Sequence, residues 1–109
     1  MNTIEHFLKI LRELQKLDPE FPLQYAMCLA MIARDEGISL TTLAQRSGLA
    51  LSTVSRIVGA LSQNRQRGLA YGLVKVKISP TERRRKELTL TARGRAYIHG
   101  ITEAVAKAA

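Results

Sequence analysis

A short segment near the middle of the 109-residue chain holds side chains that can recognise nucleic-acid bases and phosphates, namely Ser52, Thr53, Ser55 and Arg56. Arginine can donate two parallel hydrogen bonds to guanine, hydroxyl groups can bond to phosphates or bases, and a threonine methyl can contact thymine. We rank Arg56 first because bidentate donation to guanine carries the most sequence information. Taken alone, this polar face is as consistent with an ordinary solvated helix surface.

A basic cluster follows later in the chain. It consists of Arg83, Arg84, Arg85 and Lys86, directly after Glu82, with which one of the arginines can pair instead of binding a ligand. At a turn between strands, such side chains can follow phosphates or enter a narrow, negative minor groove. Arg65 and Arg67, in a preceding connection, are equally consistent with a phosphate-binding loop and with a solvated surface.

The first cluster lies in a pattern of two short helices. Ser39 can cap a helix from Leu40 to about Ser47, and Gly48 can supply the positive φ that ends it. A second helix follows, and its polar face lies opposite an apolar stripe of Leu51, Val54, Ile57, Val58 and Leu61. This spacing predicts a helix-turn-helix over residues 39–62, whose second helix enters the major groove. The first helix adds the polar residues Thr41, Thr42 and Gln45 as expected DNA contacts.

Beyond residue 72 the hydrophobic period changes from that of a helix to that of strands. Val74, Val76 and Ile78 alternate with Lys75 and Lys77, which we also expect to contact DNA, and Leu88 and Leu90 alternate with polar residues. The two strands and a basic turn from Thr81 to Lys86 predict a β-hairpin wing over residues 73–91. The segment 64–72 has no sustained period, and its Tyr71 is expected to pack over the core in preference to stacking on a base.

Helices are expected at both ends of the chain. Apolar residues from Ile4 to Leu17 recur at three- and four-residue steps, which predicts an amphipathic helix. A more apolar helix follows from Leu23 to Arg34, and Thr91 can cap a last helix from Ala92 to about Ala108. The sequence thus predicts one domain over residues 1–109, mainly α with a small β-hairpin wing, in the winged helix-turn-helix class.

Composition excludes several classes of protein. Apolar residues make up 46% and charged residues 24%, as in ordinary folded domains. The longest apolar run, residues 26–33, is too short for a membrane span, and no signal-peptide pattern begins the chain, so we expect a cytoplasmic protein with no membrane partner. A single cysteine and two distant histidines give neither a disulfide nor a metal site, and no catalytic set or cofactor motif is recognisable.

The positive charge is unevenly distributed. The net charge is +8 and the isoelectric point about 10.3. Residues 1–36 hold four basic and six acidic side chains, a balance of −2, whereas residues 37–109 hold thirteen basic and three acidic ones, a balance of +10. This pattern predicts a polyanion-binding surface in the later two thirds of the chain.

The sequence resembles the MarR family of winged-helix transcription regulators. The resemblance covers about residues 21–98 and lies in FPLQYAMCLAMIA, in the helix-turn-helix and above all in SPTERRRKELTLTARGRAYI, residues 79–98. In that family the wing typically reads Asp-Pro-x-Asp-Arg-Arg before a Leu-Thr-x-x-Gly helix start. Here Glu82 stands where the family usually has aspartate, and the connection 63–72 is several residues longer.

The resemblance implies a homodimer on a pseudo-palindromic DNA duplex, with recognition helices in successive major grooves and wing arginines in flanking minor grooves. It also implies that Glu82 orients a wing arginine, that Arg84 contacts the minor groove, and that the protein represses by occupying its operator. Many relatives are longer, so dimerisation is expected to rest on residues 1–18 and 92–109. The apolar residues available there, which packing within one chain would also use, are Ile4, Phe7, Leu8, Leu11, Tyr97, Ile101 and Val105.

Two regulatory features of the family are not indicated here. Relatives often bind small aromatic acids, but no residue set specifies such a pocket, so a small-molecule effector stays open. Some relatives sense oxidants through an exposed thiolate, whereas Cys28 lies in the most apolar helix and is expected to be an inert buried side chain.

Two other functions stay open at this stage. A winged helix can bind an acidic protein through the same basic face, because a fold does not dictate function. A non-specific nucleic-acid binder would share the positive charge but not the sequence preference. The polar leading turn of the second helix favours specific recognition, and we predict that Arg56→Ala flattens specificity more than Arg83→Ala.

Overall fold

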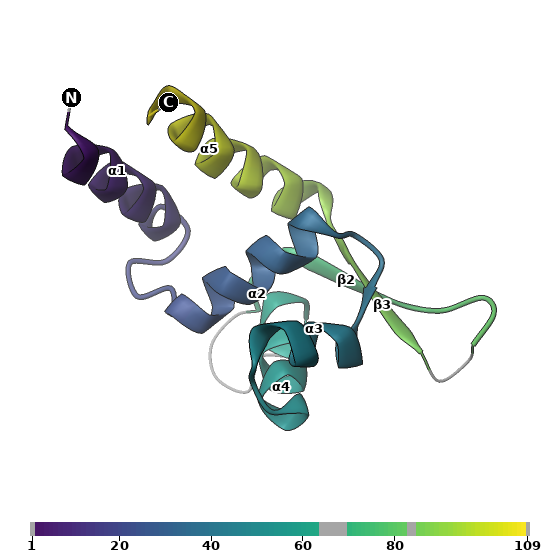
Figure 1. The fold of residues 1–109 in the computed structure, drawn as a ribbon. Coiled ribbons are helices and arrows are strands. Elements are labelled where there is room, and N and C mark those ends of the chain that lie inside the picture. Colours follow the sequence, from purple (N-terminus) through teal and green to yellow (C-terminus); the bar gives the residue numbers. More distant parts are fainter. Residues whose placement is uncertain (1, 64–69, 83–84, 109) are drawn as a thin grey trace.

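The computed structural model describes residues 2–63, 70–82 and 85–108. Its elements are α1 (Thr3–Gln15), α2 (Leu23–Arg34), β1 (Ile38–Ser39), α3 (Leu40–Ser47), α4 (Leu51–Leu61), β2 (Val74–Ile78), β3 (Lys86–Leu90) and α5 (Ala92–Ala108). In Figure 1, α1 and α5 lie side by side as an antiparallel pair, α2, α3 and α4 form a group beneath it, and the β2–β3 hairpin projects to one side. The molecule is therefore elongated, with extents of 49 × 29 × 27 Å.

Local capping sets the boundaries of the helices, as the sequence predicted. The Ser39 hydroxyl accepts a hydrogen bond from the backbone N–H of Thr42 at 3.1 Å and so caps α3. Gly48 ends α3 with a φ of 75°, a left-handed conformation that costs glycine little because it has no Cβ. Thr91 caps α5 by accepting a hydrogen bond from the N–H of Gly94 at 3.0 Å.

The sheet has one strand more than the sequence predicted. Within the described residues it has three antiparallel strands in the order β1-β3-β2. Strand β1 covers only Ile38 and Ser39, which is too short for an alternating pattern to reveal, and it pairs Ile38 with Leu88 of β3. The predicted hairpin is thus confirmed. Strand β1 pairs with β3 of this hairpin and leads directly into α3.

The basic turn of the wing is shorter than predicted. Lys86 lies within β3, where it pairs with Ile78 of β2, so it belongs to a strand and not to the turn. Before the strand, the Ser79 hydroxyl accepts hydrogen bonds from the backbone N–H groups of Thr81 and Glu82 at 3.3 and 3.2 Å. Ser79 therefore shapes the start of the turn, because its side chain supplies an acceptor to two backbone N–H groups.

The hydrophobic core lies between α2, α3, α4 and the inner face of the sheet. Its largest fully buried side chains include Leu29, Ile32, Leu43, Ile57, Leu61, Leu73 and Leu88. Full burial of a side chain of this size contributes about 1.5–3 kcal/mol. The core therefore holds α4 firmly against the rest of the fold.

A cluster of aromatic rings joins the α1–α5 pair to this core. Phe21 meets Tyr71 and Tyr97 edge to face, with ring centroids 5.1 and 5.9 Å apart. The Tyr71 hydroxyl donates to Asp18 Oδ2 at 2.5 Å, and the Tyr97 hydroxyl donates to the carbonyl of Leu14 at 2.6 Å. Burial raises the pKa of Tyr97 to about 12. The expectation that Tyr71 packs over the core is confirmed.

Three further observations concern features that the sequence did not favour. Cys28 is buried, as expected, and burial raises the pKa of its thiol. Within the described ranges, no helix is long and apolar enough to cross a membrane. In the same ranges, no three His, Cys, Asp or Glu side chains are grouped in a way that could hold a metal ion.

Candidate nucleic-acid interface

Backbone hydrogen bonds tie the wing to the end of α4. The N–H of Leu73 donates to the carbonyl of Leu61 at 2.8 Å, and that of Gly72 donates to the carbonyl of Ser62 at 3.0 Å. Both bonds join the residues just before β2 to the last turn of α4. Helix α4 and the wing therefore have a set relative position, which a shared binding surface requires.

The polar face of α4 opens into a hollow beside the wing, which we name the α4–wing hollow. It is lined by Leu40, Ser52, Ser55, Arg56, Val58, Gly59, Ser62, Val76, Lys86 and Leu88, and its cavity volume is about 430 Å³. Ser52, Ser55 and Arg56 are exposed, whereas Thr53 is half-buried. The structure thus brings three of the four predicted α4 residues together with Lys86.

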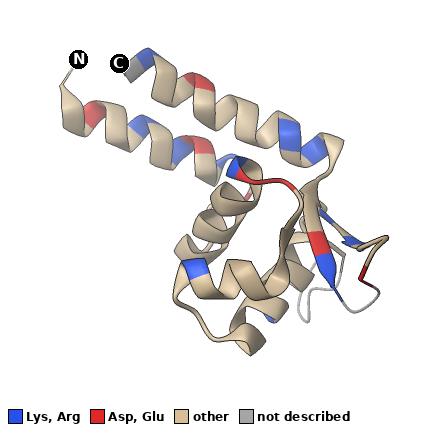
Figure 2. Ribbon diagram, turned by 45° about the vertical axis from the view of Figure 1, so that its right-hand side comes forward, with Lys and Arg blue, Asp and Glu red and all other residues tan. Residues whose placement is uncertain are grey.

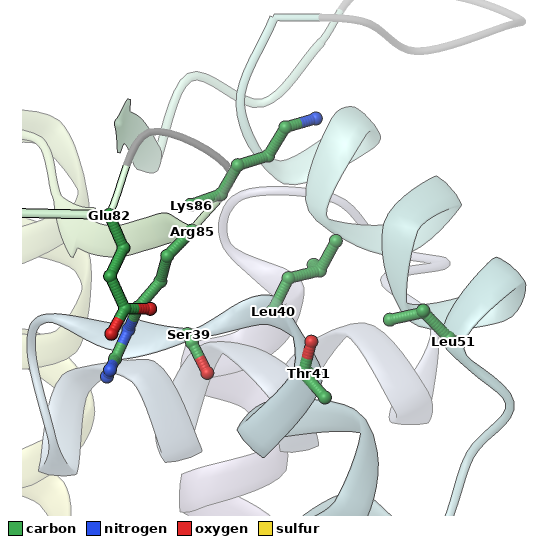
Figure 3. Close-up of a pocket in the computed structure, with 7 residues that line it drawn as sticks. All are labelled: Ser39, Leu40, Thr41, Leu51, Glu82, Arg85 and Lys86. Carbon is green, nitrogen blue, oxygen red and sulfur yellow. The ribbon is translucent and has the colours of Figure 1, made fainter. Parts of the chain in front are cut away.

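A second hollow lies where the starts of α3 and α4 meet the wing, and we name it the α3–wing hollow. It has a volume of about 500 Å³ and is lined by Ser39, Leu40, Thr41, Leu51, Glu82, Arg85 and Lys86. Figure 3 shows the Leu51 side chain extending from α4 toward Leu40 and Thr41, with Arg85 and Glu82 at the opposite end. Lys86 lines both hollows, which makes them parts of one surface.

Leu51 is the residue of α4 that the sequence pattern misplaced. The predicted apolar stripe included it, and the other stripe members, among them Val54 and Ile57, are indeed buried. Leu51, in contrast, is 49% exposed. Leu51 lies at the edge of the apolar stripe, next to the polar side of the helix, and periodicity does not show on which side of that boundary the core ends.

The three predicted residues of α3 have different surroundings. Thr41 is exposed and lines the α3–wing hollow, and Gln45 is exposed outside both hollows. Thr42 is half-buried, and its hydroxyl oxygen lies 2.8 Å from the Ser39 hydroxyl, which donates to it. Thr42 therefore takes part in the cap of α3, and Thr41 is better placed for a ligand.

The wing lysines are divided between the two faces of the sheet. Val76 and Lys86 line the α4–wing hollow, so they belong to the face directed toward α4. Side chains alternate along a strand, which assigns Lys75 and Lys77 to the opposite face. Lys77 is paired there with Glu87 of β3, and both lysines are exposed. Neither lysine lines the α4–wing hollow with Arg56, although Lys75 lines a separate hollow with Ser62 and Gln63.

Several predicted residues lie outside the described residues. They are Arg65 and Arg67 of the connection, and Arg83 and Arg84 of the wing tip. Next to the latter pair, the N–H of Arg85 donates to the carbonyl of Glu82 at 2.9 Å, and both side chains line the α3–wing hollow. In Figure 2 basic residues mark the start of α5, and both signs occur along α1 and on the wing strands.

The apolar residues predicted for dimerisation fall into two groups. On α1, Ile4 and Phe7 are 72% and 57% exposed, and Leu8 and Leu11 are exposed beside them. On α5, Val105 is exposed, whereas Ile101 and Tyr97 are half-buried and Tyr97 bonds to α1 of its own chain. The sequence missed Leu23 and Met27 of α2, which are also exposed, because a helix that is apolar on nearly every face gives no sign of its open side.

An ion pair that the sequence did not indicate joins the segment after α2 to the start of α5. Arg95 donates to both carboxylate oxygens of Glu36, at 2.6 and 2.9 Å, and the N–H of Leu90 donates to one of them at 2.8 Å. The hydrogen bond from Arg95 and then that from Leu90 hold the pKa of Glu36 below its usual range. The pair connects the end of α2 to β3 and to the first turn of α5.

The chain is similar to known proteins of one fold. Residues 28–66 match the family of IclR helix-turn-helix domains. A crystal structure of MarR is 28% identical, with a TM-score of 0.68, over 96% of this chain and 65% of that one. The crystal structure of RV1404 from Mycobacterium tuberculosis is 25% identical, with a TM-score of 0.74, over 90% of this chain and 63% of that one. The chain spans less than two thirds of the length of these two proteins.

A more distant solved structure supports the fold alone, and a comparison with curated sequences found no match. The S. aureus MepR–DNA complex has a TM-score of 0.74 at 19% identity, over 95% of this chain and 80% of that one. Among curated protein sequences, none matches this chain at a significant level. The matched domain and the shared fold are those of transcription regulators and not those of enzymes. As its motifs predicted, the chain has the winged helix-turn-helix fold of the MarR-family regulators.

Proposed function

We propose that the protein is a homodimeric regulator that binds a specific double-stranded DNA sequence and represses transcription by occupying it. The observation that carries this proposal is the surface shared by α4 and the wing. There Ser52, Ser55 and Arg56 of α4 and Lys86 of β3 line one open hollow. Hydrogen-bonding side chains on a helix next to a cation on a β-hairpin are the groups that duplex recognition needs.

The dimensions of this surface suit a duplex. A helix with its side chains is about 10–12 Å across, and the major groove is about 12 Å wide. With the first turns of α4 in the groove, Arg56 can donate two hydrogen bonds to a guanine, and Ser52 and Ser55 can reach bases or phosphates. The wing then lies along the neighbouring backbone, where Arg85 and Lys86 meet phosphates.

The charge distribution supports the same ligand. The balance of +10 over residues 37–109 belongs to the part of the chain that forms α3, α4, the wing and α5. Neutralisation of phosphates supplies most of the affinity of such a surface, and base contacts supply the preference. The S. aureus MepR structure, which has the same fold, was solved on DNA, and this favours duplex DNA over an acidic protein.

The exposed face of α1 supports a dimer. Ile4, Phe7, Leu8 and Leu11 form an apolar stripe at the surface. A two-fold contact needs only one such self-complementary patch. Two recognition helices related by this axis would read half-sites about 34–36 Å apart, which is one turn of the duplex.

Selection from a random pool of duplexes at about 150 mM salt tests the proposal, because non-specific affinity is weak there. We expect enrichment of an inverted repeat with half-site centres about 10 base pairs apart. Arg56→Ala should reduce the base preference at one or more positions of the enriched sequence. Arg93 is an exposed arginine of α5 that lines neither hollow, so the control Arg93→Ala should leave the enriched sequence unchanged. Failure to enrich any sequence would contradict specific recognition.

A further inference from the structure

We infer that Leu51 reads DNA sequence by contacting the 5-methyl group of a thymine in the major groove. This inference rests on the proposed function, since it names one feature of the base sequence that the same surface recognises. It assigns a base-reading role to a residue whose sequence pattern indicated only core packing. The evidence is the position of the side chain, its surroundings and the contrast with a second leucine at an equivalent helix start.

Leu51 lies at the leading edge of the recognition helix. It is the first residue of α4, in the turn that carries Ser52, and it is one position before the polar face begins. Ser55 follows four residues later and therefore lies on the same side of the helix. Any duplex that reaches Ser52 and Ser55 thus comes within reach of Leu51.

The α3–wing hollow around Leu51 has one apolar and one charged end. Leu51 extends toward Leu40 and Thr41, while Arg85 lies at the far end beside Glu82 (Figure 3). Lys86 contributes a further cation to the same hollow. A thymidine nucleotide presents a methyl group at its major-groove edge and an anionic phosphate on its backbone. The apolar end suits the methyl group, and the cations Arg85 and Lys86 suit the phosphate, whereas the Glu82 carboxylate beside Arg85 carries the opposite charge.

Exposure of a leucine is common at protein surfaces and would not by itself indicate a ligand. Leu23 provides the comparison, because it is also the first residue of a helix and is 71% exposed. The hollow beside Leu23 is lined by Leu8, Leu11, Leu14, Gln15, Pro19, Phe21 and Ala26, with no cation among them. Leu51 differs in having Arg85 and Lys86 across its hollow. The combination of an apolar side chain with phosphate-binding groups is what points to a nucleotide.

Removal of single methyl groups from the DNA tests this inference directly. In the duplex selected by the wild-type protein, each thymine is replaced in turn by deoxyuridine, which lacks only the 5-methyl group, and the Kd is measured by fluorescence anisotropy. We expect one thymine per half-site at which the replacement weakens binding about fourfold, the equivalent of one methylene group returned to water. Leu51→Ala should bind the thymine and deoxyuridine duplexes equally at that position.

Two variants separate this contact from general effects of losing a leucine. Leu51→Met keeps a flexible apolar side chain and should retain the sensitivity to the methyl group. Leu23→Ala removes the other exposed leucine at a helix start and should also retain it. If Leu51→Ala keeps the full sensitivity, or if the wild-type protein has none at any position, the inference is wrong while specific DNA binding stands. If no duplex is selected at all, the proposed function fails and the inference fails with it.

Discussion

Arg56 and Lys86 line the same hollow but differ in what they can recognise. The planar guanidinium of Arg56 can distinguish guanine from other bases, whereas the ammonium group of Lys86 acts as a point charge toward phosphate. We expect Arg56→Ala to cost about 1–3 kcal/mol on the selected duplex and little on unrelated ones. Lys86→Ala should weaken all duplexes similarly and reduce the salt slope by about 1. Titrations of both variants on the selected site and on its single-base changes measure this, and equal losses for Arg56→Ala on every duplex would contradict it.

Glu36 gives a prediction about stability and pH at the scale of one ion pair. Arg95 and Leu90 lower the pKa of Glu36 in the folded chain, so the unfolded chain binds the proton more readily. The stabilisation is therefore complete above the pKa of the unfolded carboxyl and disappears as the pH falls through the folded pKa. We expect Glu36→Gln to lower the free energy of unfolding at pH 7 by about 1 kcal/mol, since the pair is partly exposed. Urea unfolding at pH 7 and near pH 3 measures this, and a deficit that persists unchanged in acid would show that charge is not its cause.

Among the elements, α5 depends on a close approach that only glycine permits. A Cβ at Gly94 would overlap the backbone carbonyl of Leu73, which directly precedes β2. A Cβ at Gly100 would lie 3.3 Å from Glu13 Oε2, the end of a flexible side chain that can move. We expect Gly94→Ala to lower the free energy of unfolding by about 1–3 kcal/mol through overpacking. Gly100→Ala, in the same helix, should be neutral or stabilising by up to about 1 kcal/mol because alanine favours helix. Chemical denaturation of both variants decides the matter, and equal destabilisation would contradict the contact.

For the molecule as a whole, the exposed stripe of α1 predicts how the proposed dimer can be disrupted without unfolding the chain. Phe7 is 57% exposed, so Phe7→Glu should leave the fold intact and give a monomer where the wild-type chain forms the proposed dimer. Tyr97 bonds to Leu14 within the chain, so Tyr97→Ala should lower thermal stability instead. Sedimentation velocity and thermal melts of the two variants separate these outcomes. A Phe7→Glu protein that remains dimeric would place the interface elsewhere.

The charge of the whole molecule predicts a steep dependence of binding on salt. Each phosphate neutralised in a B-DNA complex contributes a slope of about −0.9 to log K against log salt. If Lys and Arg residues neutralise at least six phosphates in the whole complex, affinity should fall by about 10³-fold or more between 50 and 200 mM salt. Titrations at several salt concentrations measure the slope. A flat dependence would indicate that the basic surface does not face a duplex.

Local sequence was sufficient for most of the fold because its signals act between near neighbours. The cap at Ser39, the positive φ at Gly48 and the cap at Thr91 are interactions over three or four residues, and all were predicted. The change from a helical to an alternating period likewise placed the wing. The polar turn of α4 and the basic hairpin were recognised as one candidate surface on the same basis.

Contacts between distant segments decided the remainder. Strand β1 forms because Ile38 pairs with Leu88 of β3. Glu36 likewise forms its ion pair with Arg95 of α5. In both cases the partner lies far away in the sequence, so the residues around one partner do not predict the other. Residue types and periodicity predicted a winged helix with a basic surface suited to DNA. Burial is a property of the assembled core, and it alone left Leu51 exposed and placed Tyr97 against α1, because side chains compete for an interior whose edges no single segment defines.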